Sequence, residues 1–334
     1  MFKHQNRREA IEIVNAFIEL GYNVDVVYYN KKAFLPSRKY DVIFGLEPNF
    51  EKFARKNPKA LKIYYATGSY WKYQNASIID RVAEVNKRRR SSLRPARLVM
   101  SHQSAELADY IIQIGSTFTV YTYPPEIQQK IRLIRQSSFE FLDATLENKD
   151  YSSARRKFLW FGGKGAVLKG LDLLLEAFAK RPDLELYIAG APEKDFINEY
   201  YNELYQTGNI HFLEWLDLRS TFAQDIARSC GFVILPSASE GMPGSVISMM
   251  RMGLVPIVSR QAAFDGIENF GVLIQNLTVS NVLAIVDEAS RFDEDVLYKR
   301  AFMSQRFAKE NFTLETFKSD LKAVLLQCFN STQL

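Results

Sequence analysis

The sequence predicts an α/β protein of two domains, each a doubly wound parallel β-sheet with helices on both faces, arranged around a central cleft. The chain of 334 residues is longer than one ordinary domain. Its hydrophobic content of 47% and aromatic content of 13% suffice for two cores. Short apolar strand patterns alternate with helical patterns through both halves, and strands separated by helices of this length form parallel sheets.

The first half holds the expected N-terminal domain, residues 1–125. A helical apolar spacing over residues 9–20 ends at Gly21, and no strand pattern stands ahead of it. A doubly wound domain normally opens with a central strand, so this domain is expected to lack its first strand or to have a reduced sheet. Its predicted strands are 23–29, 40–46, 62–68 and 108–115.

The second half is more regular and holds the second domain, residues 157–312. Polar and turn-forming residues dominate before it, so 126–156 is predicted to connect the domains, with a short strand at 138–142. Residues 313–334 are predicted to form a helix that packs back toward the N-terminal domain. The predicted strands of the second domain are 158–163, 184–190, 209–215, 231–237, 254–260 and 271–276, and its predicted helices are 168–181, 193–205, 219–228 and 245–252.

Cysteine usage and apolar patterning predict a soluble cytoplasmic protein. The two cysteines, Cys230 and Cys328, stand far apart and in no metal-ligand spacing, which favours a reducing compartment over a disulfide framework. The start of the chain has no secretion pattern, and no apolar run approaches the roughly 18 residues of a spanning helix. We expect no metal and no cofactor.

Charge is distributed unevenly along the chain. Residues 1–150 contain 24 Lys and Arg against 16 Asp and Glu, whereas the remainder contains 19 against 22. Much of the excess lies in 51–97 and includes the run Lys87–Arg90. Such a strip predicts an anionic partner, namely phosphate groups, an acidic glycan or the inner face of a membrane, where the protein would be peripheral. The alternative is a solvated helix face. Nucleic acid is not an expected partner.

A glycine-rich segment, FGGKGAVLKG over 161–170, lies where the first strand of the second domain ends and a helix begins. In an open α/β sheet, ligands bind at the carboxyl ends of strands, where helix N-termini favour anions. The glycines let the backbone approach an anion, and Lys164 and Lys169 could converge on one diphosphate. Each charge-assisted contact would contribute about 1.5–3 kcal/mol. The alternative is an ordinary turn with two exposed lysines.

A second segment, PSASEGMPGS over 236–245, directly follows another strand of this domain. Its glycines and Pro243 shape a loop that leads into a helix, with Ser245 as the expected N-cap. The carboxylate of Glu240 is suited to accept hydrogen bonds from sugar hydroxyls. The alternative role for Glu240 is local capping or pairing.

Because both segments follow strands of one parallel sheet, their loops can face the same crevice. Here the sequence resembles retaining GT-B glycosyltransferases of family 4, also called group 1, best over about 157–260. That family has a basic residue after a glycine, a lysine five positions on, and a segment Glu-Gly-x-x-x-x-x-x-Glu-x-Met-x-x-Gly. This chain supplies Gly163-Lys164, Lys169-Gly170, Glu240-Gly241, Met250 and Gly253.

The resemblance implies a role for each matching position. Lys164, where the family usually has arginine, and Lys169 would bind the donor diphosphate and stabilise the leaving group. Glu240 would contact the transferred sugar. Ser248 falls where the family has a second glutamate that holds the ribose hydroxyls, and this departure raises the prospect of lost activity. The other donor-binding positions implied are Gly163, Gly165, Gly241, Met242, Pro243, Gly244 and Ser245.

The resemblance also implies the substrates. The donor would be a nucleoside diphosphate sugar, with a UDP-sugar favoured over a GDP-sugar. The acceptor would be a glycan or a lipid-linked glycan in polysaccharide or glycoconjugate biosynthesis. The nucleobase contacts stay unassigned, because Trp215 can be read either as a stacking residue or as a core residue.

The loop that follows the predicted strand 62–68 is expected to face the cleft on the acceptor side. Family members often have a histidine where this chain has Thr67, so no imidazole is available there. Tyr70 is suited to a sugar face, although packing in the core is an equal alternative. The acceptor or cleft candidates are Thr67, Gly68, Ser69, Tyr70 and His4.

The predicted reaction is transfer of a glycosyl group with retention of configuration. Its catalytic candidates are Lys164, Lys169 and Glu240, and no Asp-x-Asp ligand motif is present, so a metal-independent mechanism is expected. Two other functions stay open. One is a non-catalytic binding or partner subunit with the GT-B shape, which Ser248 and Thr67 favour. The other is a sugar-nucleotide epimerase.

Overall fold

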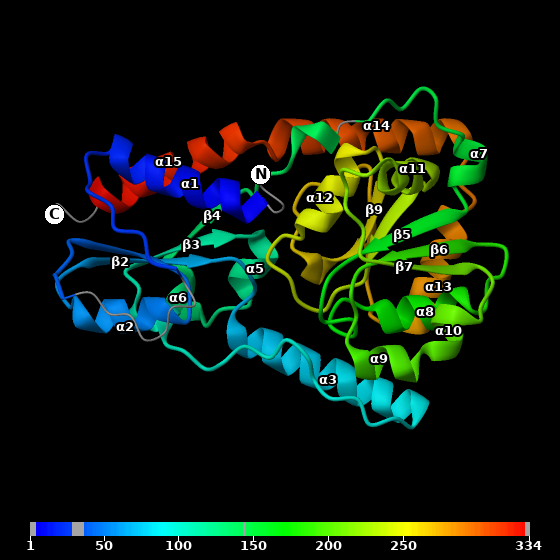
Figure 1. The fold of residues 1–334 in the computed structure, drawn as a ribbon, viewed down its shortest axis with the longest axis horizontal. Helices are drawn as coiled ribbons and strands as arrows, with labels where there is room; N and C mark the ends of the chain where they lie inside the picture. Colours follow the sequence, from blue (N-terminus) through cyan, green and yellow to red (C-terminus); the bar gives the residue numbers. More distant parts are fainter. Residues whose placement is uncertain (1–4, 29–36, 143, 331–334) are drawn as a thin grey trace.

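The computed structural model describes residues 5–28, 37–142 and 144–330. These residues form two α/β units that lie side by side, each around its own parallel sheet (Figure 1). The predicted fold class is therefore confirmed. Within the described residues, no helix is both long enough and apolar enough to cross a bilayer.

The sheet of the first unit has four strands in the order β1-β2-β3-β4, all parallel. The strand predicted at 23–29 is absent from its described part, 23–28, where Val26 is 72% exposed and Tyr28 is 66% exposed. The apolar alternation there is not matched by burial, and the sheet is a reduced one. Its strands are β1 (Val42–Gly45), β2 (Leu61–Ala66), β3 (Tyr110–Ile114) and β4 (Ile131–Ile134).

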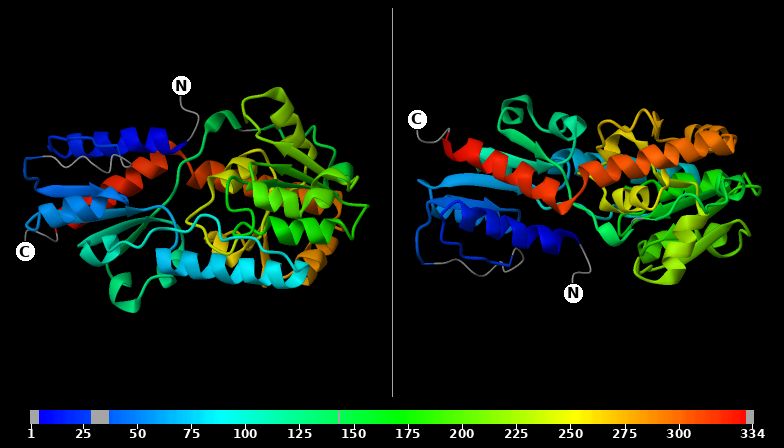
Figure 2. Two further views of the ribbon diagram at one scale, coloured as in Figure 1. Left: turned by 60° about the horizontal axis from the view of Figure 1, so that its bottom comes forward. Right: turned by 90° about the horizontal axis from the view of Figure 1, so that it is seen from above.

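Helices cover both faces of this first sheet (Figures 1 and 2). Helix α1 (Gln5–Glu19) lies beside α15 (Leu314–Asn330) over one face, and α2 (Asn49–Lys56) lies on the other. Phe17 of α1 is buried and packs edge to face on Phe44 of β1, with ring centroids 5.3 Å apart. The short helices of this unit are α4 (Ser104–Leu107), α5 (Thr117–Tyr121) and α6 (Pro125–Gln128).

The second unit contains a six-stranded parallel sheet in the order β10-β9-β8-β5-β6-β7. All six strands predicted for this half are present, and the central strands β8 and β9 are apolar runs that are buried throughout. The strands are β5 (Lys157–Phe161), β6 (Glu185–Ala189), β7 (Ile210–Glu214), β8 (Phe232–Leu235), β9 (Val255–Ser259) and β10 (Val272–Ile274).

Helices pack on both faces of the second sheet (Figures 1 and 2). The predicted helix at 193–205 is interrupted at Tyr200 and forms two shorter helices. The helices of this unit are α7 (Tyr151–Ala154), α8 (Leu171–Phe178), α9 (Lys194–Glu199), α10 (Tyr201–Tyr205), α11 (Thr221–Ser229), α12 (Gly244–Arg251), α13 (Val279–Ala289) and α14 (Glu294–Asn311), with a 3-10 turn η2 (Arg260–Ala262).

Two segments connect the units. The segment predicted as a connection, 126–156, contains β4, which pairs with β3, and the strand predicted at 138–142 is instead the 3-10 turn η1 (Glu140–Leu142). The chain returns through α14 to α15, which lies against the first unit. There Lys322 donates to the carboxylate of Glu19 at 3.0 Å.

A third element, α3 (Trp71–Arg89), starts in the first unit and runs along the second (Figure 1). Its end carries part of the predicted basic strip. Arg88 contacts the carboxylate of Glu176 at 2.8 Å, and Arg89 contacts that of Glu199 at 2.9 Å. Arg88 and Arg89 therefore form ion pairs within the protein, and the alternative of a solvated helix face does not describe these two residues.

Candidate active site

The two segments predicted to bind the donor meet at the carboxyl ends of β5 and β8, which are neighbours in the sheet. The amide of Ala238 donates to the carbonyl of Leu168 at 2.8 Å, and this bond ties the two loops together. Gly170 has a left-handed φ of +69°, and a Cβ there would lie 2.2 Å from the carbonyl oxygen of Pro236. The close approach of the loops therefore requires a glycine at this position.

Lys169 and Glu240 are the centre of this arrangement. Their side chains are only 9% and 11% exposed, and the ammonium group is paired with the carboxylate. The hydroxyl of Ser237 also donates to this carboxylate, at 3.2 Å. The indole of Trp160 donates to the carbonyl of Lys169 at 3.2 Å, which fixes the backbone that carries the ammonium group. A nearly buried ion pair at a loop junction is thus held in place from several sides.

Lys164 lies elsewhere on the same loop and is exposed, as is Gly163. The loop is contacted from the first unit by Arg97, which donates to the carbonyl of Lys164 at 3.5 Å. The structure therefore brings Lys169 and Glu240 together but leaves the ammonium group of Lys164 on the surface.

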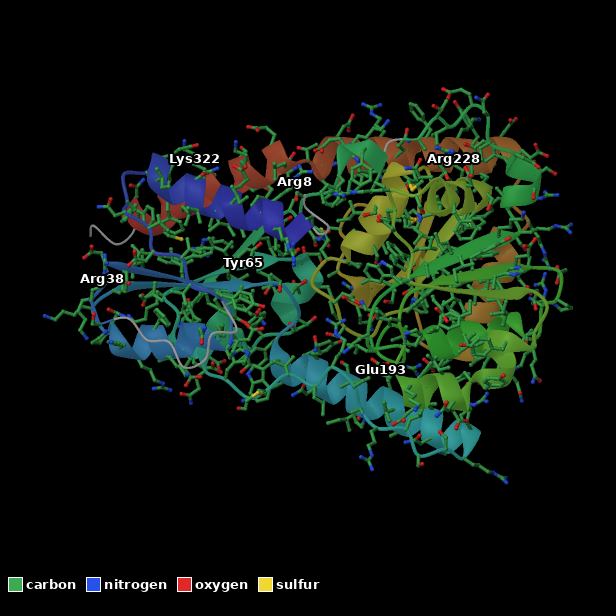
Figure 3. The ribbon with its side chains drawn as sticks, viewed as in Figure 1. Arg8, Arg38, Tyr65, Glu193, Arg228 and Lys322 are labelled. Atoms are coloured by element: carbon green, nitrogen blue, oxygen red, sulfur yellow. The ribbon has the colours of Figure 1, made fainter. Side chains whose placement is uncertain are left out.

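The carboxylate of Glu193 lies against the glycine-rich loop. It accepts hydrogen bonds from the amides of two consecutive residues, Gly165 and Ala166, the latter at 3.1 Å. Glu193 directly precedes α9, and Figure 3 places it beside the junction of the two units. No sequence motif singled out this residue, although a carboxylate three residues after Gly190, which follows β6, is a signal for it.

The loop that contains Glu240 leads into α12. This helix begins at Gly244 with Pro243 at the N-cap position, so the expected N-cap role of Ser245 is wrong. Gly244 is covered by two side-chain amides, because a Cβ there would lie 2.2 Å from Nε2 of Gln5 and 2.6 Å from Nε2 of Gln136. Helix α1 and the connecting segment therefore reach the start of α12.

Met242 of the same loop lines a cavity of about 450 Å³ between the two units. Gly115 and Ser116, at the end of β3, line it from the first unit, and Asp265 lines it from the second. Asp265 also accepts hydrogen bonds from the amide and hydroxyl of Thr117, both at 2.9 Å. The lining includes neither Lys169 nor Glu240, so a cleft at the two donor loops stays a prediction.

Ser248 is on α12 and is 7% exposed. Its hydroxyl donates to the carbonyl of Gly244 at 2.7 Å, one turn earlier in the helix. Because this bond uses its proton, the hydroxyl presents only lone pairs to a ligand.

The acceptor-side loop meets the donor loop directly. The hydroxyl of Ser69 donates to the backbone carbonyl of Glu240 at 2.8 Å. A Cβ on Gly241 would lie 2.2 Å from the carbonyl oxygen of Thr67 and 3.1 Å from the Cα of Gly68. Three of the acceptor candidates are thus in contact with the donor loop, and His4 lies outside the described residues.

Tyr70 belongs to the interior of the first unit. It is 4% exposed, packs against Tyr123 with ring centroids 5.0 Å apart, and donates to Glu106 at 2.8 Å. Burial raises the pKa of its hydroxyl well above the ordinary value. Tyr70 is therefore a core residue, which was one of its two interpretations. Trp215, which directly follows β7, is 77% exposed and is not a core residue.

His102 lies beside this aromatic cluster. Its ring centroid lies 6.0 Å from that of Tyr64 and 6.0 Å from that of Trp71. Its Nδ1 accepts a hydrogen bond from the amide of Ser104 at 3.3 Å. Burial lowers its pKa below the ordinary value, against the opposing effect of Glu47, Glu106 and Glu51.

The sequence predicted that the protein binds no metal, and this stays a prediction. Across residues 5–28, 37–142 and 144–330, no three His, Cys, Asp or Glu side chains gather as ligands for a metal ion.

Comparisons with known proteins agree with this description. Residues 155–291 match the model of the family described as Glycosyl transferases group 1. That range contains both loops of the candidate site. None of the curated proteins compared with the sequence matches it.

Several solved structures have a similar fold. HepE from Anabaena, in complex with UDP and glucose, is 15% identical, with a TM-score of 0.55 over 83% of this chain and 80% of that one. Sucrose-phosphate synthase from Thermosynechococcus elongatus is 15% identical, with a TM-score of 0.57 over 91% and 82%. A TarM variant from S. aureus is 14% identical, with a TM-score of 0.53 over 81% of this chain and 51% of that one. The described chain therefore has the GT-B fold, and its second unit carries the sequence pattern of group 1 glycosyl transferases.

Proposed function

We propose that this protein is a glycosyltransferase that moves a sugar from a nucleoside diphosphate sugar to a glycan or lipid-linked glycan, with retention of configuration. The observation that carries the proposal is the pair of Lys169 and Glu240, held by two loops at neighbouring strand ends. A cation for a diphosphate and a carboxylate for sugar hydroxyls stand together, next to the loop of Ser69 from the other unit.

Cleavage of the bond between sugar and phosphate builds negative charge on the departing diphosphate. In the proposal, Lys169 and the N-terminus of α12 stabilise that charge, and they do so more in the transition state than in the ground state. Lys164, which is exposed on the same loop, is proposed as a second cation for the diphosphate. With these groups in place, a metal-independent mechanism is proposed.

Glu240 has a different task in this mechanism. Its carboxylate would exchange part of its contact with Lys169 for hydrogen bonds from the hydroxyls of the transferred sugar. The contacts of Ser69 and Gly241 with the facing loop would exclude water from the reacting sugar and so limit hydrolysis.

The similar structures support the proposed substrates. HepE is described with UDP and glucose, which supports a UDP-sugar as donor. The TarM variant is described with fondaparinux, α-GlcNAc-glycerol and UDP, which supports a glycan acceptor and a role in polysaccharide or glycoconjugate synthesis. Family 4 membership and a cytoplasmic location are parts of the same proposal.

Contact with an anionic membrane is proposed for a smaller part of the basic strip than the sequence suggested. Arg88 and Arg89 are engaged in ion pairs, whereas Lys59, Lys87 and Arg90 are exposed. Vesicles that contain anionic lipid should sediment the protein at low salt and release it at high salt. Absence of sedimentation at low salt would refute this contact.

A non-catalytic partner subunit is the second candidate, and the position of Ser248 favours it. Its uncharged hydroxyl is already bonded to Gly244, so the ribose would be held more weakly than by a carboxylate. Release of UDP from UDP-sugars in the presence of glycan acceptors distinguishes the two candidates. The proposed function predicts release that depends on the acceptor, and binding of UDP without any release would favour the partner subunit.

A further inference from the structure

The carboxylate of Glu193 occupies a position suited to a phosphate group. Two consecutive amides, of Gly165 and Ala166, donate to its two oxygens. Gly165 has a left-handed φ of +91°, and a change of backbone hand is the geometry that turns successive amides toward one anion. The loop therefore offers an anion site, and a residue of the protein itself fills it.

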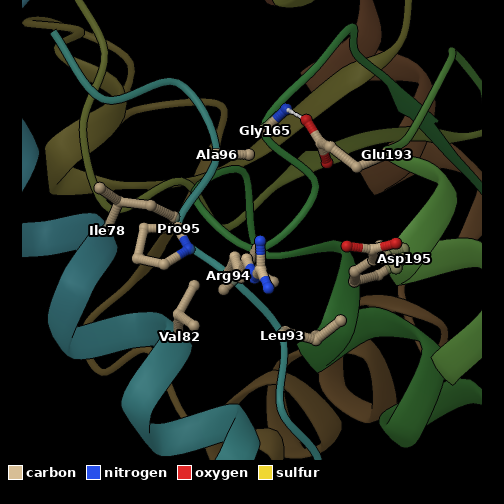
Figure 4. Close-up of a pocket in the computed structure, with 11 residues that line it drawn as sticks. Ile78, Val82, Leu93, Arg94, Pro95, Ala96, Gly165, Glu193 and Asp195 are labelled. Atoms are coloured by element: carbon tan, nitrogen blue, oxygen red, sulfur yellow. Dashed lines mark hydrogen bonds between the residues drawn. The ribbon is translucent and has the colours of Figure 1, made fainter.

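The direction of this side chain supports the same view. Glu193 is at the N-cap position of α9, yet its side chain makes no capping bond to that helix. The carboxylate turns instead to the neighbouring loop, as Figure 4 shows for its contact with Gly165. The contact therefore serves the glycine-rich loop and not the start of α9.

The contact borders a cavity whose lining is largely apolar and includes Val82, Leu93 and Phe196. This cavity of about 170 Å³ is also lined by Gly165 and Glu193, and by Arg94 of the first unit and Asp195 of α9 (Figure 4). If the carboxylate moved aside, the amides would face a space bordered by the exposed Arg94 and by the loop that carries Lys164.

Positive groups of the glycine-rich loop are thus neutralised internally at two points. The ammonium group of Lys169 is paired with Glu240, and the amides of the glycine-rich loop are bonded to Glu193. A diphosphate that arrives must compete with carboxylates of the protein for each of these positive groups.

We propose that Glu193 is an internal competitor of the donor diphosphate, which must displace this carboxylate from the amides of Gly165 and Ala166 to bind fully. The inference rests on the proposed function, because it assigns these amides to the diphosphate of a nucleotide sugar. The carboxylate keeps the glycine-rich loop satisfied while the site is empty, and it weakens the binding of nucleotide to the free enzyme.

The test compares Glu193→Gln with the wild type by calorimetric titration with UDP, inorganic pyrophosphate and uridine. The amide side chain is isosteric and removes the charge, so UDP and pyrophosphate should bind about tenfold more tightly. Uridine has no phosphate, and its affinity should not change. The matched control is Asp195→Asn, which removes one charge from the same cavity at a residue for which the structure shows no bond to the loop amides.

The outcomes separate this inference from the proposed function. If the wild type binds UDP and Glu193→Gln binds it no better, the competition is refuted while the donor site stands. An equal gain in Glu193→Gln and Asp195→Asn would also refute it, because general repulsion would then explain the effect. If neither the wild type nor Glu193→Gln binds UDP or pyrophosphate, the proposed function falls together with the inference.

Discussion

The hydroxyl of Ser69 donates to the backbone carbonyl of Glu240 over 2.8 Å, and this bond joins the first unit to the donor loop of the second. Gly241 packs beside it, against the carbonyl of Thr67. The two units therefore meet at the residue proposed to contact the transferred sugar. Any change that separates these two loops should act on turnover before it acts on the stability of either unit.

Substitution of Gly241 by alanine tests this contact. The added Cβ would lie 2.2 Å from the carbonyl oxygen of Thr67, so the loops must move apart. We expect sugar transfer from the donor to fall by at least about tenfold, because small displacements in an active site cost that much or more. The measurement is acceptor-dependent release of UDP.

The matched control is Gly208→Ala, where a Cβ would meet nothing within 4 Å. Both variants should keep a melting temperature close to that of the wild type. If Gly241→Ala transfers sugar at the rate of the control, the loop contact has no part in the reaction.

Substitution of Lys169 by alanine should weaken the binding of UDP by about tenfold to a hundredfold. The reason is the loss of a charge-assisted contact, which is worth about 1.5–3 kcal/mol. Isothermal titration with UDP measures this change, and Lys322→Ala on α15, which pairs with Glu19 far from the site, is the control.

Loss of Lys169 also leaves the carboxylate of Glu240 without its partner, and this could itself change the binding of UDP. The variant Glu240→Gln separates the two effects. The glutamine variant keeps the ammonium group, so it should bind UDP at least as well as the wild type while its sugar transfer falls. Unchanged UDP binding in Lys169→Ala would exclude the assigned role of the lysine.

The ion pairs between α3 and α8 predict a large effect on stability. Asp172 is fully buried, and it accepts hydrogen bonds from Arg81 at 2.7 Å and from Arg88 at 2.9 Å. Asp172→Asn removes the buried charge that both guanidinium groups share, although Arg81 keeps Glu84 and Arg88 keeps Glu176. It should lower the free energy of unfolding by about 3–5 kcal/mol, because Arg81 is nearly buried and loses its buried partner. Denaturant unfolding measures this loss.

Glu84→Gln is the control for that variant, since Glu84 pairs with the same Arg81 but is 56% exposed. An exposed pair should contribute about 1 kcal/mol or less. Equal losses in the two variants would mean that the buried pairs do not hold α3 to the second unit.

His102 predicts a dependence of stability on pH. Its pKa in the folded protein lies below the ordinary value of 6.5, so folding opposes its protonation. Its contribution to stability is therefore complete above pH 6.5 and is lost as the pH falls through the lowered pKa. Protonation would also remove the acceptor that Nδ1 offers to the amide of Ser104.

His102→Asn should lose less of its melting temperature between pH 7.5 and pH 5 than the wild type does. The asparagine oxygen can accept from the amide two residues on without titrating. Parallel melting curves across pH for the two proteins would contradict this assignment.

The sequence predicted most of the second unit because its strands are short apolar runs between helical patterns. The first unit was harder to predict. The strand β4 has only four residues, Ile131–Ile134, and lies inside a polar stretch, so the local sequence pattern did not predict it. It is a strand because its backbone pairs with β3. Residues 23–28 alternate like a strand, yet Val26 remains exposed and pairs with no strand of the described part of the chain.

The candidate site was predictable only where a motif marked it. Lys169 and Glu240 lie in segments with glycines after strands, and the structure brings them together. The roles of Glu193 and Arg89 depend on tertiary packing, since their partners are 27 and 110 residues away along the chain. A run of basic residues could not reveal that α3 crosses to the second unit.

The most direct test of the donor site is a crystal structure of the protein with UDP. We expect the diphosphate between the ammonium group of Lys169 and the backbone amides at the start of α12, with the glycine-rich loop beside it. A diphosphate bound away from Lys169, with the pair of Lys169 and Glu240 undisturbed, would contradict this expectation.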